Sequence, residues 1–239
     1  MVGALLLAAG SGTRMKGKVD DKLLQPIGNT NAFLLSCEAF LQSPPIRSLT
    51  ILYKDEGQLQ RLQQSLEHHS HQLPNSPTSK IRWVKGGEER QDSVWAGLNE
   101  LPEEITHVLI HDCARPFISS QTICEAAEVI TQEKAVAVAR PLKDTLRQRI
   151  DPSPHPIEPS KTRTVDRSNH WLMETPQGAP KKWLIEGLQK AKDSQISVTD
   201  DLGAIELIGH PVALLEIHYP NPKITTPDDF SYAQFLSQT

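Results

Sequence analysis

The sequence predicts an α/β fold, namely a Rossmann-like, doubly wound sheet that is mixed but mostly parallel and carries a protruding β-arm. Three observations lead to this prediction. Apolar, partly β-branched runs recur along the chain and are unbroken, as is typical of strands covered on both faces. Stretches of helical period separate these runs. A proline-rich excursion interrupts the alternation once, after which the helical pattern resumes. We therefore expect one domain over residues 1–239.

The elements follow in chain order. The apolar runs predict strands at 4–9, 49–53, 81–84, 106–111 and 135–139. Apolar residues at three- and four-residue spacing predict intervening helices at 32–41, 56–66, 93–101 and 122–131. After the excursion we expect helices at 181–192 and 199–208 and a strand at 212–217. Thr226 is a good N-cap and Pro227 a good first residue for a last helix.

The excursion covers about residues 143–172. Its centre, IDPSPHPIEPSK, holds four prolines in twelve residues, which excludes a helix. The flanking segments DTLRQRI and TRTVDR predict two strands with a long tip between them. Because such an arm cannot bury both of its faces alone, we expect it to pack on a second subunit. A floppy insertion is the alternative.

Composition and charge exclude several classes of protein. A net charge of −4 with only 5% aromatic residues argues against a nucleic-acid binder. Three cysteines without a CxxC pair indicate reduced thiols and a cytoplasmic location. The N-terminal apolar run is too short for a signal peptide, and no window approaches the length of a membrane span. We therefore expect neither a nucleic-acid partner nor a membrane.

A polar segment at 68–80, HHSHQLPNSPTSK, predicts a surface loop. Its three histidines have no cysteine or carboxylate partner nearby, so we do not expect them to bind a metal.

The stretch LLLAAGSGTRMKGK, residues 5–18, resembles two familiar glycine loops and matches neither. A dinucleotide fingerprint needs a third glycine where Met15 stands, and a phosphate P-loop needs a hydroxyl where Val19 stands. What remains is a strand end followed by Gly10 and Gly12, which let backbone N–H groups face an anion. Arg14 adds a guanidinium fork that matches phosphate oxygens. The loop therefore indicates phosphate binding.

LAAGSGTRM with a lysine at 22 resembles the signature of sugar-nucleotide and alditol-nucleotide pyrophosphorylases. Four further blocks follow in order: GGEERQDSVWAGL, HDCARPF, DTLR with TVDR and TPQG, and PKITTPDDF. Together they resemble the 2-C-methyl-D-erythritol 4-phosphate cytidylyltransferase family of the non-mevalonate isoprenoid pathway, over almost the whole chain. The resemblance implies a single nucleotidyltransferase domain, a homodimer held by the β-arm, and Mg²⁺ as cofactor. It also implies transfer of CMP from CTP to the polyol phosphate, with release of pyrophosphate.

The resemblance also assigns roles to residues. It implies catalytic roles for Arg14, Lys22 and Lys223. For CTP binding it implies Ala8, Ala9, Gly10, Gly12, Thr13, Gly87, Ser93 and Asp112, with Asp112 also the Mg²⁺ ligand. For the polyol phosphate it implies Arg115, Thr145, Arg167, Thr175 and Lys223, of which Thr145 and Arg167 reach the neighbouring subunit.

Some positions depart from the family or lack a catalytic role. The family's Cys-Pro-Lys is here Asp20-Asp21-Lys22, and we expect both carboxylates to face solvent, since facing inward they would oppose phosphate binding. We expect His111 to pack or hydrogen-bond at its strand end. Asp144 is a candidate for holding Arg167 in place.

Two alternatives stay open. A ribitol 5-phosphate cytidylyltransferase would share the glycine loop and the HDCARP block, and the acceptor residues discriminate weakly between two polyol phosphates. A non-catalytic nucleotide-binding protein on the same scaffold would be expected to lack Arg14, Lys22 or Asp112, and all three are present. Because the chain ends soon after the last motif, we expect no fused cyclase.

Overall fold

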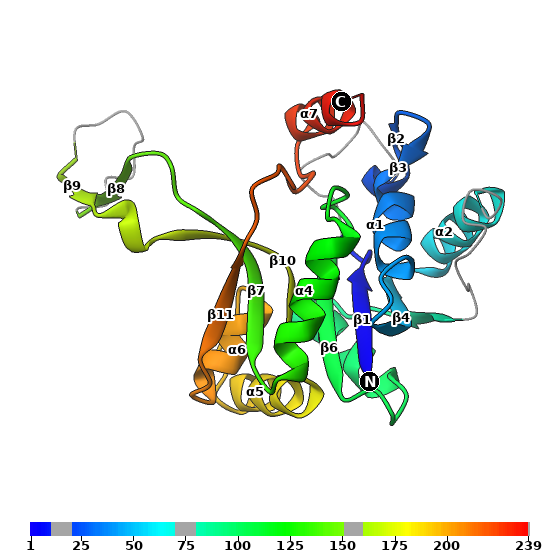
Figure 1. The fold of residues 1–239 in the computed structure, drawn as a ribbon, viewed down its shortest axis with the longest axis horizontal. Coiled ribbons are helices and arrows are strands. Elements are labelled where there is room, and N and C mark those ends of the chain that lie inside the picture. The colour runs from blue at the N-terminus through cyan, green and yellow to red at the C-terminus, as the bar shows by residue number, and fades with distance from the viewer. Residues whose placement is uncertain (11–20, 70–79, 151–159, 239) are drawn as a thin grey trace.

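The computed structural model of the protein describes residues 1–10, 21–69, 80–150 and 160–238. Its centre is a seven-stranded sheet with the order β11-β7-β10-β6-β1-β4-β5 (Figure 1). The strands are β1 (Val2–Leu7), β4 (Ile46–Tyr53), β5 (Ile81–Lys85), β6 (His107–Asp112), β7 (Ala135–Pro141), β10 (Trp171–Pro180) and β11 (Val212–Glu216). β10 runs antiparallel to both of its neighbours, and the other pairings are parallel. The predicted mixed, mostly parallel sheet is therefore confirmed.

Helices cover both faces of this sheet. They are α1 (Ala32–Leu41), α2 (Glu56–His68), α3 (Arg90–Glu100), α4 (Ser120–Thr131), α5 (Lys181–Asp193), α6 (Asp201–Leu207) and α7 (Pro227–Leu236). Side chains of Asn31, Asp55, Ser119, Asp200 and Thr226 cap five of them by accepting a hydrogen bond from a backbone N–H in the first turn. The predicted start of α7, with Pro227 at its first position, is confirmed.

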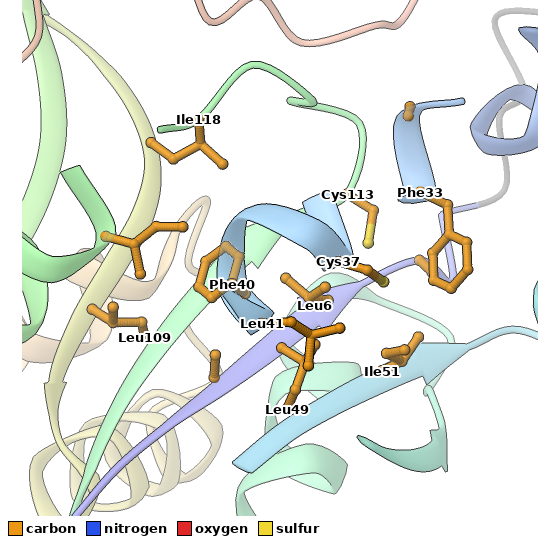
Figure 2. Packing of buried hydrophobic residues seen from close by; sticks show 14 of the residues in the cluster. Leu6, Phe33, Cys37, Phe40, Leu41, Leu49, Ile51, Leu109, Cys113 and Ile118 are labelled. Carbon is orange, nitrogen blue, oxygen red and sulfur yellow. The ribbon is translucent and has the colours of Figure 1, made fainter. Parts of the chain in front are cut away.

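Two apolar cores lie on the two faces because successive strand residues point to opposite sides. On β1, Leu6 joins a core under α1, α2 and α4, whereas Leu5 joins a second core under α3, α5 and α6. Figure 2 shows Phe40 and Leu41 of α1 packed over Leu6 in the first core. Each large side chain buried in this way contributes about 1.5–3 kcal/mol of transfer free energy.

Most predicted elements are present, with ends shifted by a few residues. The first strand ends at Leu7 and not at residue 9, so the two alanines after it belong to the site described below. One central strand was missing from the prediction. It is β10, which includes the TPQG block that we identified only as a family motif. A Cβ on Gly178 would lie 2.5 Å from the carbonyl oxygen of Val108, so the close pairing with β6 requires glycine there.

The arm is a two-stranded antiparallel hairpin of β8 (Leu146–Arg149) and β9 (Thr162–Val165), as predicted. It extends away from the body of the molecule (Figure 1). The guanidinium of Arg147 donates to the hydroxyls of Thr162 and Thr164 across the hairpin. The proline-rich tip lies outside the described residues, and packing on a second subunit stays a prediction.

Two smaller features complete the described chain. β2 (Pro26–Ile27) and β3 (Thr30–Asn31) form a short hairpin before α1, with Gly28 at a φ of +58° in its turn. Two short 3-10 helices are η2 (Lys22–Leu24), before β2, and η5 (Arg167–Asn169), between β9 and β10 at the base of the arm. Among the described helices, none is long and apolar enough to cross a membrane.

Candidate active site

A cleft of about 410 Å³ opens at the carboxyl ends of β1, β5 and β6. This is the edge where open α/β sheets bind ligands. The residues that line it end or follow β1, β4, β5 and β6 in the chain, or belong to η2 and the segment before α7. They include Ala8, Ala9, Gly10, Lys22, Lys54, Gly87, Arg90, Ser93, Asp112 and Lys223.

Asp112 ends β6 and lies between two cations. Its Oδ2 is 2.6 Å from the Nζ of Lys223, and its Oδ1 is 3.4 Å from the Nε of Arg90. Burial alone would raise the pKa of Asp112, but Arg90 and Lys223 lower it to about 2. The carboxylate is therefore ionised at neutral pH.

Arg90, at the start of α3, is itself held by a buried carboxylate. Its two terminal nitrogens donate to the two oxygens of Asp201 over 2.8 and 2.7 Å. Burial raises the pKa of Asp201, and Arg90 offsets part of this rise. Sequence reasoning missed both residues. The arginine stands in the GGEERQDSV block, but its partner is 111 positions away and only the fold brings them together.

Lys22 begins η2 and lines the same cleft. Its Nζ donates to the carbonyl of Ile224 over 2.9 Å. The neighbouring Asp21 does not face solvent as we expected. Its Oδ1 accepts from the N–H of Leu23 over 3.0 Å and its Oδ2 from the amide of Gln58 over 2.8 Å, so it caps η2. The expectation was wrong for Asp21, and Asp20 lies outside the described residues.

The loop after β5 is fixed against α3. The Oγ of Ser93 accepts from the N–H of Gly87 over 3.1 Å and donates to the carbonyl of Glu89 over 3.2 Å. A Cβ on Gly87 would lie 2.3 Å from the Cβ of Asp92, so this close approach requires glycine. Both residues predicted here line the cleft.

Thr175 and His111 form buried hydrogen bonds next to Asp112, which lines the cleft. The hydroxyl of Thr175 accepts from the N–H of Asp112 over 3.1 Å and lies 2.9 Å from the Nδ1 of His111. The other ring nitrogen of His111 lies 3.1 Å from the carbonyl oxygen of Arg115. Burial lowers the pKa of His111 to about 4, so the ring is neutral at pH 7. The interpretation of His111 as a packed, hydrogen-bonded residue is confirmed.

Arg115 connects three segments behind the cleft. Its guanidinium donates to the carbonyls of Asn221 and Met173 and lies 3.5 Å from the carboxylate of Glu174. Glu174 is buried and also pairs with Arg140 over 2.5 Å. Arg115 is not among the residues that line the cleft.

Thr145 and Arg167 lie at the base of the arm and not at the cleft of their own chain. Both are exposed. Arg167 donates to the carbonyl of Lys143, where the sequence suggested Asp144 as its partner. If these two residues serve a cleft, it is that of another copy.

Three predicted residues, Gly12, Thr13 and Arg14, lie outside the described part of the chain. So does His71 of the histidine-rich segment, whereas His68 and His69 accept or donate hydrogen bonds at the end of α2. Among the residues that the structure describes, no three His, Cys, Asp or Glu side chains gather where they could hold a metal.

Comparisons with known proteins give one consistent result. Residues 2–239 match the model of the family described as "IspD: 2-C-methyl-D-erythritol 4-phosphate cytidylyltransferase". The chain is 35% identical over 231 residues to the enzyme of that name from Synechococcus sp. (strain WH7803), covering 96% of each chain. It is 36% identical over 236 residues to the bifunctional enzyme IspD/IspF of Desulfotalea psychrophila, covering 97% of this chain but only 56% of the bifunctional enzyme. Among solved structures, it resembles 4-diphosphocytidyl-2C-methyl-D-erythritol synthase from Anaerococcus prevotii with a TM-score of 0.82 and 25% identity, covering 100% of this chain and 96% of the other.

Proposed function

Because the chain belongs to the 2-C-methyl-D-erythritol 4-phosphate cytidylyltransferase family, we propose that its cleft transfers CMP from CTP to 2-C-methyl-D-erythritol 4-phosphate. The products are CDP-methylerythritol and pyrophosphate, in the synthesis of isoprenoid precursors. The observation that carries the proposal is the cleft at the sheet edge, in which Arg90 and Lys223 flank one ionised carboxylate and Lys22 lines the same cavity.

The reaction needs positive charge more than it needs a protein nucleophile. An oxygen of the methylerythritol phosphate attacks the α-phosphorus of CTP, a new P–O bond forms, and the bond to the β-phosphate breaks. Negative charge accumulates around the α-phosphoryl group and on the departing pyrophosphate. Lys22 and Lys223, which both line the cleft, would stabilise this charge in the transition state. We propose the same role for Arg14.

Cytosine would be read mainly by backbone groups. Ala8 and Ala9 follow β1 directly, and Gly87 lines the same cleft. Cytosine offers an N4 donor and the acceptors N3 and O2, so a carbonyl, an amide N–H and a hydroxyl can distinguish it from uracil. Ser93 supplies the hydroxyl and also holds the N–H of Gly87 in place.

Asp112 fits a Mg²⁺ site of the kind that forms only with substrate. Mg²⁺ is commonly bound by one or two carboxylates together with substrate phosphates and water. Asp112 is ionised and lines the cleft, so it can provide that one carboxylate. A bound Mg²⁺ would neutralise phosphate charge. Lys223, now paired with Asp112, is positioned at the same oxygen and can turn to the phosphates of the substrates.

The acceptor would bind between two copies of the chain. We propose that Thr145 and Arg167 of one arm enter the cleft of the other subunit and meet the polyol phosphate beside Lys223. Large apolar side chains exposed on the arm and its base, Leu146, Ile150 and Leu172, support packing on a second copy. Arg115 and Thr175 would act by holding the wall of the acceptor site.

The activity is tested by measuring pyrophosphate release with CTP, Mg²⁺ and methylerythritol phosphate. Ribitol 5-phosphate replaces the acceptor in one arm of the experiment, and UTP replaces CTP in another. We expect release with methylerythritol phosphate and CTP, and its loss in Lys22→Ala. Release with ribitol phosphate alone would change the acceptor, and no release with either would refute the proposal.

Shared sites are tested by mixing two variants that each keep only a small residual activity, Lys22→Ala and Arg167→Ala. If each cleft needs Lys22 of one subunit and Arg167 of the other, half of the dimers after exchange carry one intact site, and activity returns to about a quarter of wild type. No recovery, or a monomer by light scattering, would refute the shared site.

We also propose a cytoplasmic location, supported by three unpaired cysteines.

A further inference from the structure

Gln58, in the first turn of α2, is a buried amide whose hydrogen-bonding groups are used in three directions. Its side chain is part of a residue only 4% exposed. The Oε1 accepts from the N–H of Lys54 over 2.7 Å. The Nε2 donates to the carbonyl of Ala8 over 3.1 Å and to the Oδ2 of Asp21 over 2.8 Å. One side chain thus joins the ends of β4 and β1 to the start of η2.

The position of Gln58 is itself fixed. Its backbone N–H donates to the Oδ1 of Asp55, the N-cap of α2, over 2.8 Å. Because the helix start is capped and the amide is buried, the side chain has little freedom to leave its three partners. The Gln58 amide can therefore hold Lys54, Ala8 and Asp21 in fixed positions.

Asp21 links the Gln58 side chain to η2, the short helix that begins with Lys22. One oxygen of its carboxylate accepts from Gln58 and the other caps η2 through the N–H of Leu23. Lys22 is the first residue of η2, and its Nζ donates to the carbonyl of Ile224 at the cleft. Asp21 thus fixes the 3-10 turn that carries Lys22, and the carbonyl of Ile224 holds its ammonium.

We propose that Gln58 is a positioning residue for Lys22 and acts through the carboxylate of Asp21. The inference rests on the proposed function, in which Lys22 stabilises charge at the phosphates. The same amide holds the carbonyl of Ala8, where cytosine would be read, so Gln58 sets the spacing between the base end and the phosphate end of the nucleotide site. No group that Gln58 contacts is a reacting atom.

The test reverses the direction of one hydrogen bond. Gln58→Glu keeps the acceptor for Lys54 but places a carboxylate against that of Asp21, whereas Asp21→Asn places two NH₂ groups together. Each single variant should lower kcat about 10-fold to 100-fold, because small misplacements of a transition-state group have effects of that size. In the double variant a donor again faces an acceptor, so kcat should return towards wild type. The KM for CTP should stay raised, because the carbonyl of Ala8 still lacks its donor.

Controls separate positioning from general damage. Gln60→Glu makes the same chemical change on an exposed position of the same helix and should leave kcat and melting temperature unchanged. Asp21→Asn, at a half-buried position, carries the same test if Gln58→Glu does not fold.

A double-mutant cycle with Lys22→Ala gives the decisive result. If Gln58 acts through Lys22, then Gln58→Glu should change kcat less than about twofold once Lys22 is absent. An equal loss of kcat in both backgrounds, or a double variant no better than the single ones, would overturn the inference. An inactive wild type would instead refute the proposed function. In that case the inference is decided by CTP affinity in calorimetry, which must fall in Gln58→Glu and not in Gln60→Glu.

Discussion

Replacing Asp201 with alanine measures what the buried ion pair with Arg90 contributes to stability. The side chain of Asp201 is 3% exposed and that of Arg90 is 29% exposed. Removing one partner of a buried pair costs about 3–5 kcal/mol, because the other charge is left without compensation. Arg90 would keep some access to water and its 3.4 Å contact with Asp112, so we expect the lower end, about 3 kcal/mol.

The assay is urea denaturation followed by circular dichroism, with thermal unfolding beside it. For a domain of this size, about 3 kcal/mol corresponds to a fall in Tm of about 6–12 °C. Lys182→Ala is the matched control, because Lys182 lies 3.0 Å from Glu133 but both side chains are more than half exposed. That pair should contribute less than about 1 kcal/mol. Equal, small losses in the two variants would refute the reasoning that burial decides the contribution.

Three further predictions concern the cleft and the last helix. Gly87→Ala should raise the KM for CTP about tenfold, because the new Cβ would lie 2.3 Å from Asp92 and the loop must shift; steady-state kinetics with an unchanged KM would contradict this. Lys223→Ala should lower kcat about 10²-fold to 10³-fold and raise the pKa of Asp112, which loses a cation 2.6 Å away; a wild-type kcat for pyrophosphate release would contradict it. Burial would raise the pKa of Asp229, but hydrogen bonds from the preceding threonines lower it below its ordinary value of 3.8. The ionised carboxylate therefore stabilises the folded state above pH 3.8. This stabilisation is lost as the pH falls through the pKa that Asp229 has in the folded protein. Urea midpoints between pH 5 and 3 should therefore fall more steeply for wild type than for Asp229→Asn, and parallel curves would exclude this contribution.

The sequence was sufficient for most of the fold because its signals there are local. The unbroken apolar runs and capped helices appear where periodicity placed them, and Thr226 with Pro227 starts α7. β10 was missed for a physical reason. Its residues include two prolines and a glycine, which usually weaken a strand, and only the close approach of Val108 explains why Gly178 belongs there.

Site residues that belong to a sequence motif could be predicted. Site residues whose interaction partners come from a distant part of the chain could not. Ala8, Gly87, Ser93, Asp112 and Lys223 all come together at the cleft. Charge alone could not show that Arg90 is held by a carboxylate on α6, since nothing in the local sequence links the two.

Asp21 illustrates the same limit of sequence reasoning. Its carboxylate was expected to avoid the cleft because it would repel phosphate. In the structure the carboxylate instead accepts hydrogen bonds from the N–H of Leu23 in η2 and from the buried amide of Gln58, which only the tertiary structure brings near.

The strand order has a consequence for the order in which the protein is made. β6, β1, β4 and β5 are adjacent in the sheet, and all four have been synthesised once residue 112 is complete. They carry the alanines after β1, the loop at Gly87 and Asp112, which form the nucleotide side of the cleft. β7, β10 and β11, with Lys223 beyond them, are made later and add to one edge of that group. A ribosome can thus deliver a paired four-stranded half-sheet before the acceptor side of the cleft exists, and domains generally begin to fold during synthesis from the N-terminal side.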